Sequence, residues 1–360
     1  MLTELYYNHV AKQIEKRDEK NIKEKLAQCE VVPLSKEQKK EIEAYYQKVL
    51  GRKVPTLWHG YFYSRNGFFS EKYIPTSVYH SEIVFKLNYH DFRLAYVDKG
   101  LYDTYFYDVN RPKTIVKNIN GYYYDDKRNI SEKEALDRCM NLSSAVAKPS
   151  LEGMWGRGVM VFSSQNGITN QGDTINQIFS KYKHSFIIQE KVIQHKEMMR
   201  LNPSSLNTLR IMTYRDRNQV HVLYAVVRIG RTGQSVDNET AGGINADVDL
   251  ETGKIRECAY GTPKEKKILT TDVGTVLDGF QIPSFHEALS IAKELHPRLP
   301  YFNLIGWDFG IEENGQPIMI EWNRAPDLSQ TAHGPAFGEM TDEILSTVRR
   351  LPNTKIVKLA

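Results

Sequence analysis

Residues 306–323 read GWDFGIEENGQPIMIEWN. Two short apolar runs flank Asn314-Gly315, and an Asn-Gly pair between alternating runs predicts a hairpin with a two-residue turn. Such a hairpin places Asp308 directly opposite Glu321, because successive side chains of a strand point to opposite faces. Asn323 then lies on the same face as Glu321.

Two carboxylates that face each other across a ladder repel, so a cation between them or a protonated carboxyl usually accompanies them. Carboxylate and amide oxygens suit Mg²⁺, which commonly binds one or two carboxylates plus substrate phosphates. The hairpin therefore predicts a magnesium site formed by Asp308, Glu321 and Asn323. The alternative is that Asp308 and Glu321 point into solvent without binding a metal. Alternation places Trp307 and Ile320 on the opposite face under both interpretations, so it does not distinguish them.

The composition is that of an ordinary globular protein. The chain has 360 residues, 41% hydrophobic and 26% charged, enough for two or three lobes. The net charge of +4 does not indicate a nucleic-acid-binding protein, and it would not hinder an anionic substrate. The partners expected are small molecules, and the sequence does not fix an oligomeric state.

The cysteines and the apolar runs bear on the compartment. Cys29, Cys139 and Cys258 are scattered and lack metal-ligand spacing, which is typical of free thiols in a reducing compartment. The N-terminus is rich in Lys and Glu and does not resemble a signal peptide. No apolar run approaches the ~18 residues that a membrane span needs. These observations predict a soluble, cytoplasmic protein.

Three regions are expected along the chain. Residues 1–75 form a helical N-terminal region: residues 3–28 are amphipathic, and a capping box at Ser35 starts a second helix. Residues 76–191 form a first lobe and residues 192–350 a second. Helices and mostly antiparallel strands alternate without a regular βαβ rhythm, so the predicted fold class is α+β.

The pattern predicts further elements within the two lobes. Capping boxes at Ser131 and Ser284 predict helices, the first of which runs to about Leu142. A final helix is expected near residues 340–350. Strands are expected at 145–148, 159–162, 186–192, 208–214, 220–229 and 244–250.

A glycine-rich loop, residues 152–158, joins two of the predicted strands. Its glycines allow backbone amides to converge on an anion, and Lys148 and Arg157 supply positive charge. The loop is not a P-loop, because GxxxxGK[ST] and the following helix are missing. The alternative is a mobile surface loop without a ligand.

Three longer stretches carry a family resemblance: NPSSLNTLRIMTY (202–214), GGINADVDLETGKI (242–255) and IGWDFGIEENGQPIMIEWNRAPDLSQ (305–330). Over roughly residues 75–345 the chain resembles the ATP-grasp superfamily. It is most similar to the sugar-transfer-associated ATP-grasp proteins encoded among polysaccharide-biosynthesis genes. The resemblance implies the ATP-grasp fold, in which two α+β lobes hold ATP between them, with Mg²⁺ as cofactor.

The resemblance also implies site residues. Nucleotide contacts would come from Lys99, Lys148, the loop residues Gly153, Gly156, Arg157 and Gly158, and the inter-lobe segment with Gln189, Glu190, Val192 and Ile193. The metal ligands would be Asp308, Glu321 and Asn323. Arg210 and Arg324 would be catalytic, with Arg210 near the transferred phosphoryl group. The acceptor substrate would face Asn207, Arg228 and His333.

The chain departs from the family pattern at two positions. Many amino-acid ligases of the superfamily have an arginine two residues before the first metal carboxylate, where this chain has Gly306. Another cation, Arg210 or Arg228, would then stabilise the reacting group. Trp155 is also bulkier than the residues that relatives have in the glycine-rich loop.

The reaction implied is an ATP- and Mg²⁺-dependent carboxylate–amine ligation that forms ADP and proceeds through an acyl phosphate. Such a ligase would attach an amino acid or amine to a carboxylated sugar for a surface or capsular polysaccharide. No dedicated nucleophile is needed, and the sequence has no GxSxG motif. Two alternatives remain: a kinase of a small-molecule or sugar hydroxyl, and a non-catalytic nucleotide-binding subunit of polysaccharide assembly.

Overall fold

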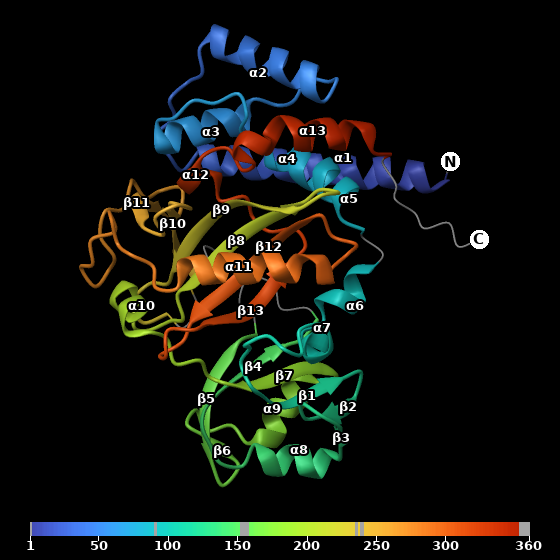
Figure 1. Ribbon diagram of the computed structural model, residues 1–360, viewed down its shortest axis with the longest axis vertical. Helices are drawn as coiled ribbons and strands as arrows, with labels where there is room; N and C mark the ends of the chain where they lie inside the picture. The colour runs from blue at the N-terminus through green and yellow to red at the C-terminus, as the bar shows by residue number, and fades with distance from the viewer. Residues whose placement is uncertain (1, 90–91, 152–157, 235–236, 238–240, 353–360) are drawn as a thin grey trace.

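The computed structural model describes residues 2–89, 92–151, 158–234, 237 and 241–352. Figure 1 shows three parts stacked along the longest axis: a helical region, a larger sheet in the middle and a smaller sheet with its own helices. Within the described residues, no helix is both long enough and apolar enough to cross a membrane.

The larger sheet is antiparallel throughout, with the strand order β11-β10-β9-β8-β12-β13. Its strands are β8 (Thr208–Arg215), β9 (Val220–Ile229), β10 (Ile244–Val248), β11 (Ile255–Tyr260), β12 (Leu304–Ile311) and β13 (Pro317–Asn323). The strands predicted at 208–214, 220–229 and 244–250 are confirmed as β8, β9 and β10. β11 was not predicted.

The hairpin of β12 and β13 differs from the prediction at its turn. Phe309 pairs with Met319 but Asp308 pairs with Glu321, so a bulge at Ile320 shifts the register by one residue. At the turn, Glu312 bonds Gln316, which leaves a three-residue loop that ends in Gly315 at φ +88. The two-residue turn was therefore wrong, whereas the pairing of Asp308 with Glu321 is confirmed.

The smaller sheet is also antiparallel, with the order β3-β2-β1-β7-β4-β5-β6. Its strands are β1 (Thr114–Ile119), β2 (Tyr122–Tyr124), β3 (Asn129–Ile130), β4 (Leu142–Pro149), β5 (Met160–Gln165), β6 (Ile168–Thr169) and β7 (Ser185–Glu190). Helices α8 (Glu132–Arg138) and α9 (Ile175–Tyr182) pack against it in one hydrophobic cluster. α8 ends at Arg138, four residues before the predicted end, because the chain must turn there into β4.

The remaining helical segments lie in the upper two parts of Figure 1 or, like α7, at the border with the smaller sheet. They are α1 (Leu2–Leu26), α2 (Lys36–Val49), α3 (Leu57–Asn66), α4 (Thr76–Val78), the π-helix η1 (Tyr79–Ile83), α5 (Val84–Leu87), α6 (Arg93–Val97), η3 (Lys99–Leu101), α7 (Tyr102–Tyr105), α10 (Lys196–Leu201), α11 (Phe285–Leu295), η5 (His296–Arg298), α12 (Gln330–His333), η6 (Gly338–Met340) and α13 (Thr341–Arg350). The capping box at Ser35 is confirmed, whereas Ser284 has φ 51 and its side chain does not cap α11.

The two faces of the larger sheet are covered differently. Along β12, Ile305, Trp307 and Phe309 point toward α11 and pack in its cluster. The alternate residues face the helical region, where Leu304 joins a cluster with α2 and α13. Asp308 and Leu304 are four residues apart on β12, so their side chains point to the same face of the sheet. The helical region covers this face at Leu304.

The smaller sheet is connected to the larger one by two neighbouring segments. Gln189 donates from Nε2 to Pro112 O at 3.0 Å, and Glu190 N donates to Lys113 O at 2.9 Å. The chain thus enters and leaves the smaller sheet side by side. Since residues between Val78 and Leu87 pack with the larger sheet, we propose that the first lobe consists of residues 113–190 rather than 76–191.

Candidate nucleotide and substrate site

A cavity of about 1240 Å³ lies where the three parts meet. Its walls come from the larger sheet, the smaller sheet, the segment between them and the helical region. Most of the predicted site residues line it: Lys99, Lys148, Gln189, Glu190, Val192, Arg210, Arg228, Asp308, Glu321, Asn323 and Arg324. The topology therefore brings together side chains that are up to 225 residues apart in the sequence, from Lys99 to Arg324.

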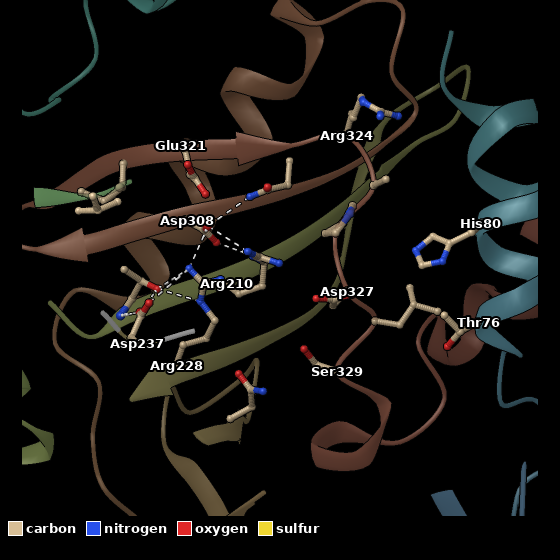
Figure 2. A pocket seen from close by; sticks show the side chains of 18 of the residues that line it. Thr76, His80, Arg210, Arg228, Asp237, Asp308, Glu321, Arg324, Asp327 and Ser329 are labelled. Atoms are coloured by element: carbon tan, nitrogen blue, oxygen red, sulfur yellow. Dashed lines mark hydrogen bonds and ion pairs between the residues drawn. The ribbon is translucent and has the colours of Figure 1, made fainter. Parts of the chain in front are cut away.

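Asp308 is fully buried and is held by two arginines, as Figure 2 shows. The Arg210 guanidinium donates to both carboxylate oxygens, with Nη2 at 2.9 Å from Oδ2. Arg228 Nη2 donates to the same Oδ2 at 3.0 Å, and Asn323 Nδ2 lies 3.2 Å from it. Burial opposes the charge on Arg210, but the Asp308 carboxylate raises the pKa of the guanidinium above its ordinary value. The guanidinium of Arg210 is therefore held in its charged form.

Arg228 also connects this cluster to a buried acid that the sequence did not single out. Its Nε donates to Thr208 Oγ1 at 3.0 Å, and Thr208 N donates to Asp237 Oδ2 at 3.0 Å. Burial raises the pKa of Asp237 above its usual range, although Arg228 opposes this. Asp237 lies in a loop without a recognisable motif, so no pattern could have identified it.

Glu321 faces two lysines that come from different parts of the fold. Lys99 Nζ, at the start of η3, lies 3.2 Å from Glu321 Oε2. Burial alone would raise the pKa of Glu321, but the charges of Lys99, Lys148, Arg228 and Arg210 lower it to about 2. Glu321 is thus a permanent carboxylate in a cationic setting.

Lys148 stands on β4 of the smaller sheet and faces the hairpin from across the cavity. Burial and the neighbouring charge of Lys99 lower its pKa from 10.5 to about 8, while Glu321 acts in the opposite direction. An ammonium group that burial and a neighbouring cation disfavour is well placed to gain from an anionic ligand.

Replacement of Lys148 by Met should have opposite effects on stability and nucleotide binding. The folded-state pKa is lowered, so the lysine's cost to stability is fully present below pH 8 and is relieved as the pH rises toward 10.5. Lys148→Met should therefore raise the midpoint of urea unfolding below pH 8, while ATP binds about 10- to 100-fold more weakly in calorimetric titration. Lys181→Met, the same change at an exposed position of α9, is the matched control. Unchanged ATP affinity in Lys148→Met would place the phosphates elsewhere.

The donor set fits a magnesium ion that is shared with a ligand. Asp308, Glu321 and Asn323 present two carboxylates and an amide oxygen from one edge of the hairpin. Among the described residues, no three acidic, histidine or cysteine side chains cluster as a metal site. Mg²⁺ commonly completes its octahedral shell with substrate phosphates and water. The hairpin therefore suits Mg²⁺ bound together with a nucleotide rather than alone.

The four residues predicted for the inter-lobe segment lie at the end of β7 and directly after it. Gln189, Glu190 and Val192 line the cavity, and Lys113 Nζ holds Glu190 Oε1 at 2.8 Å. Ile193 is 64% exposed, and its carbonyl accepts from Glu313 N at 2.9 Å at the tip of the hairpin of β12 and β13. The side chain of Ile193 thus lies outside the cavity.

The glycine-rich loop is described only at its end. Gly153, Trp155, Gly156 and Arg157 lie outside the described residues. Gly158 has φ +76, and a Cβ there would meet Pro149 Cγ at 3.1 Å, so the position requires glycine. The role of the loop stays a prediction.

Two residues predicted to face the acceptor lie elsewhere. Asn207 is fully buried, and its amide nitrogen donates to the carbonyls of Met198 and Asn202, both at 2.8 Å. His333 stacks on Tyr224 with ring centroids 4.0 Å apart, and burial lowers its pKa to about 3. Neither residue lines the cavity. The acceptor roles of Asn207 and His333 stay predictions, which the lining of the cavity does not support.

The structure explains why residue 306 is glycine. A Cβ at Gly306 would lie 2.5 Å from Pro326 Cβ and 3.2 Å from Arg210 Cδ. An arginine at this position would have to displace the loop that follows β13. The cations of this site instead come from β8 and β9, as Arg210 and Arg228.

Gly306→Ala should destabilise the protein by about 1–3 kcal/mol, since overpacking a filled site forces its neighbours to move. The displaced Arg210 should also lower turnover. Gly310→Ala on the same strand is the comparison, because its Cβ would meet only side-chain methyl groups of Ile318 and Leu206 at 3.2 Å. Urea denaturation of both variants measures the difference. Equal stability in both would show that the loop at Pro326 yields without cost.

The sequence did not anticipate that the helical region would contribute to the cavity wall. Arg17 and Asp18 of α1, Thr76 of α4 and His80 of η1 line it together with the sheet residues. The sequence assigned Arg17 and Asp18 to the helical N-terminal region, and Thr76 and His80 to the first lobe. Only long-range packing places them here, because Asp18 and His80 are 62 residues apart.

Two antiparallel sheets that enclose a cationic cavity with paired carboxylates define an α+β protein of the ATP-grasp fold. The chain belongs to the sugar-transfer associated ATP-grasp family, whose sequence profile matches residues 86–344. No curated protein sequence matches the chain.

The solved structures to which the chain is similar are distant in sequence. D-alanyl-alanine synthetase A of Vibrio cholerae is 13% identical, with a TM-score of 0.38, covering 70% of this chain and 62% of that one. N5-carboxyaminoimidazole ribonucleotide synthetase of Thermotoga maritima is 12% identical, with a TM-score of 0.37, covering 71% and 49%. VanG D-Ala:D-Ser ligase of Enterococcus faecalis is 11% identical, with a TM-score of 0.40, covering 70% and 60%. The chain thus spans about half to three fifths of the length of these proteins.

Proposed function

We propose that the protein is an ATP- and Mg²⁺-dependent ligase that joins a carboxylate to an amine and forms ADP. The observation that carries the proposal is the charge pattern at one end of the cavity. Two carboxylates of one hairpin, Asp308 and Glu321, face cations contributed by both sheets and by η3. This arrangement suits a nucleotide held between the lobes with its phosphates at the hairpin.

The chemistry of carboxylate activation requires such a pattern. Phosphorylating a carboxylate with ATP brings two anions together, so their repulsion must be neutralised and the groups aligned. Lys99 and Lys148 can neutralise the phosphates, while Arg210 and Arg228 lie beside Asp308 where charge develops during transfer. Bound Mg²⁺ would stabilise charge on the transferring phosphoryl group. We place the ion at Asp308, Glu321 and Asn323.

The remaining residues bind, orient and exclude water. An acyl phosphate hydrolyses in water, and the enclosed position of the cavity between the sheets reduces that loss. Gln189, Glu190 and Val192 line the cavity between the sheets, where the base of the nucleotide would lie. Arg324, at the end of β13, lines the cavity beyond the hairpin and would face the acid substrate.

The family supports a substrate linked to sugar transfer. We propose a carboxylated sugar as the acid and an amino acid or another small amine as acceptor, in surface or capsular polysaccharide biosynthesis. The reaction would take place in the cytoplasm, where ATP is supplied. Cys29, Cys139 and Cys258 are free thiols, which is compatible with that compartment.

The experiment that tests the function is a screen for products. The purified protein is incubated with Mg²⁺, ATP, one free or nucleotide-linked hexuronic acid and one amino acid, and both ADP and phosphate are measured. A ligase forms ADP and phosphate only when acid and amine are both present, and mass spectrometry detects the amide. A stable phosphoester without free phosphate would identify a kinase instead. ATP binding without any turnover would identify a nucleotide-binding subunit.

A further inference from the structure

The wall of the cavity that α1 and η1 form carries a histidine–aspartate pair. His80 Nδ1 lies 3.2 Å from Asp18 Oδ2, and Arg17 donates to the other oxygen, Oδ1, from Nε and Nη2, both at 3.2 Å. The Asp18 side chain is 4% exposed whereas that of His80 is 25% exposed. The carboxylate is thus buried behind a ring that remains open to the cavity.

The contact fixes the tautomer of His80. An ionised carboxylate can only accept a hydrogen bond, so Nδ1 carries the proton and Nε2 of the neutral ring keeps its lone pair. Among the described residues, no group forms a hydrogen bond with Nε2. Figure 2 shows the ring pointing from its helix into the cavity, toward the loop with Arg324 and Asp327.

The backbone around His80 is unusual and firmly held. His80 lies in a single π-helical turn, Tyr79–Ile83, within an otherwise α-helical stretch from Thr76 to Leu87. Such turns are rare and occur frequently at functional sites. On the other side of this turn, Glu82 binds Arg52 Nη2 at 2.9 Å and Lys86 Nζ at 2.8 Å. These contacts fix the turn that presents His80 to the cavity.

We infer that His80 is the general base for the amine acceptor and that Asp18 is its positioning residue. The inference rests on the proposed ligase function. A small amine is mostly an ammonium ion near neutral pH, and the ammonium has no lone pair with which to attack. A base with a fixed lone pair, in the cavity wall opposite the hairpin of β12 and β13, is suited to remove this proton.

The step balances as follows. Nε2 takes one proton from the ammonium, and the free amine attacks the acyl carbon, forming the C–N bond. The bond between that carbon and the phosphate oxygen then breaks. The second proton of the nitrogen leaves with the phosphate, which departs as HPO₄²⁻, and His80 returns its proton to water. Asp18 stabilises the imidazolium that exists in between.

The groups that face His80 suit this role. Asp18 and Arg17 of α1 face the His80 ring. Glu15 of α1 is close by, because its Oε1 lies 3.3 Å from Oγ of Ser81, the residue after His80. Arg324 and Asp327 face it across the cavity. Asp18 and His80 both precede the residues that match the family profile, 86–344. The proposed base and its positioning residue therefore come from the helical region, outside the matched residues.

The test compares two acceptors that differ in their need for a base. Hydroxylamine is largely unprotonated near neutral pH, so it traps an acyl phosphate as a hydroxamate without general-base help. Wild type and His80→Asn are each assayed with ATP, Mg²⁺ and the hexuronic acid that gives turnover in the product screen. The acceptor is hydroxylamine in one assay and the amino acid in the other. We expect amide formation to fall by about 100-fold or more in His80→Asn while hydroxamate formation changes by less than about threefold. Asp18→Asn should shift the same ratio in the same direction.

His221→Asn is the matched control, because His221 Nε2 pairs with Asp216 Oδ2 at 2.9 Å outside the cavity. It should leave the ratio of amide to hydroxamate unchanged. Equal losses of both products in His80→Asn would assign His80 a structural role and overturn the inference, as would undiminished amide formation. Absence of hydroxamate from the wild type with every acid would reject the ligase function itself, and the inference with it.

Discussion

Glu321→Gln should lower ATP turnover by at least about 100-fold, because the loss of even an outer partner of a metal ligand costs 10- to 100-fold. The change removes a permanent carboxylate that faces Lys99 at 3.2 Å. The affinity for ATP measured by calorimetry should then no longer depend on Mg²⁺, since only one of the two proposed carboxylate ligands remains. ATP titrated without Mg²⁺ should bind both proteins similarly.

The same hairpin provides the control for this prediction. Glu313→Gln makes the identical change at an exposed position of the turn, outside the cavity. It should leave both turnover and the Mg²⁺ dependence of ATP binding as in the wild type. If Glu321→Gln keeps near-normal turnover, the metal site does not include Glu321, and the proposed position of the phosphates is wrong.

Asp308→Asn should destabilise the protein by about 3–5 kcal/mol, because it leaves buried arginine charge without its counterion. Arg210 is 6% exposed, and its guanidinium donates to both Asp308 oxygens. Urea denaturation, monitored by circular dichroism, measures the loss. This variant is thus unsuited to test metal binding alone, since a fall in turnover would combine unfolding with the loss of a ligand.

A double variant separates charge from packing. Asp308→Asn/Arg210→Gln removes both charges and should recover part of the stability that Asp308→Asn loses. Asp216→Asn breaks a partly exposed pair with His221 and should cost no more than about 1 kcal/mol. A loss as small as this in Asp308→Asn would mean that Arg228 and Asp237 rearrange to compensate the change.

The sequence predicted the pairing at the centre of the site through a partly wrong argument. The Asn-Gly pair indicates a turn but not its length, and Gly315 ends a three-residue loop instead. The bulge at Ile320 shifts the register back by one residue before Asp308 is reached. Bulges depend on contacts of the whole sheet, so short-range patterns do not reveal them.

The polar residues of the loops were harder to assign than those of the strands. On β8, β9 and β12, the alternation of side chains and the burial of the apolar face restrict Arg210, Arg228 and Asp308 to the opposite face of the sheet. Asn207 and His333 carry no such constraint, and polarity alone does not distinguish a ligand contact from a buried hydrogen-bonding role. The contribution of His80 depends on how α1 packs against η1, which no local pattern encodes.

The packing of α2 against α13 has a consequence for the order in which the protein forms during synthesis. Tyr45 Oη donates to Asp342 Oδ1 at 2.7 Å, and Arg349 Nη1 to Lys48 O at 3.0 Å, so residues made early on the ribosome contact residues made some 300 positions later. Distant contacts form late because closing so long a loop costs entropy before any contact is gained. The residues of the smaller sheet are contiguous and can fold as soon as they emerge. The apolar contacts of α2 with Ile344, Leu345 and Val348 of α13 must therefore wait until nearly the whole of this sequence has been made.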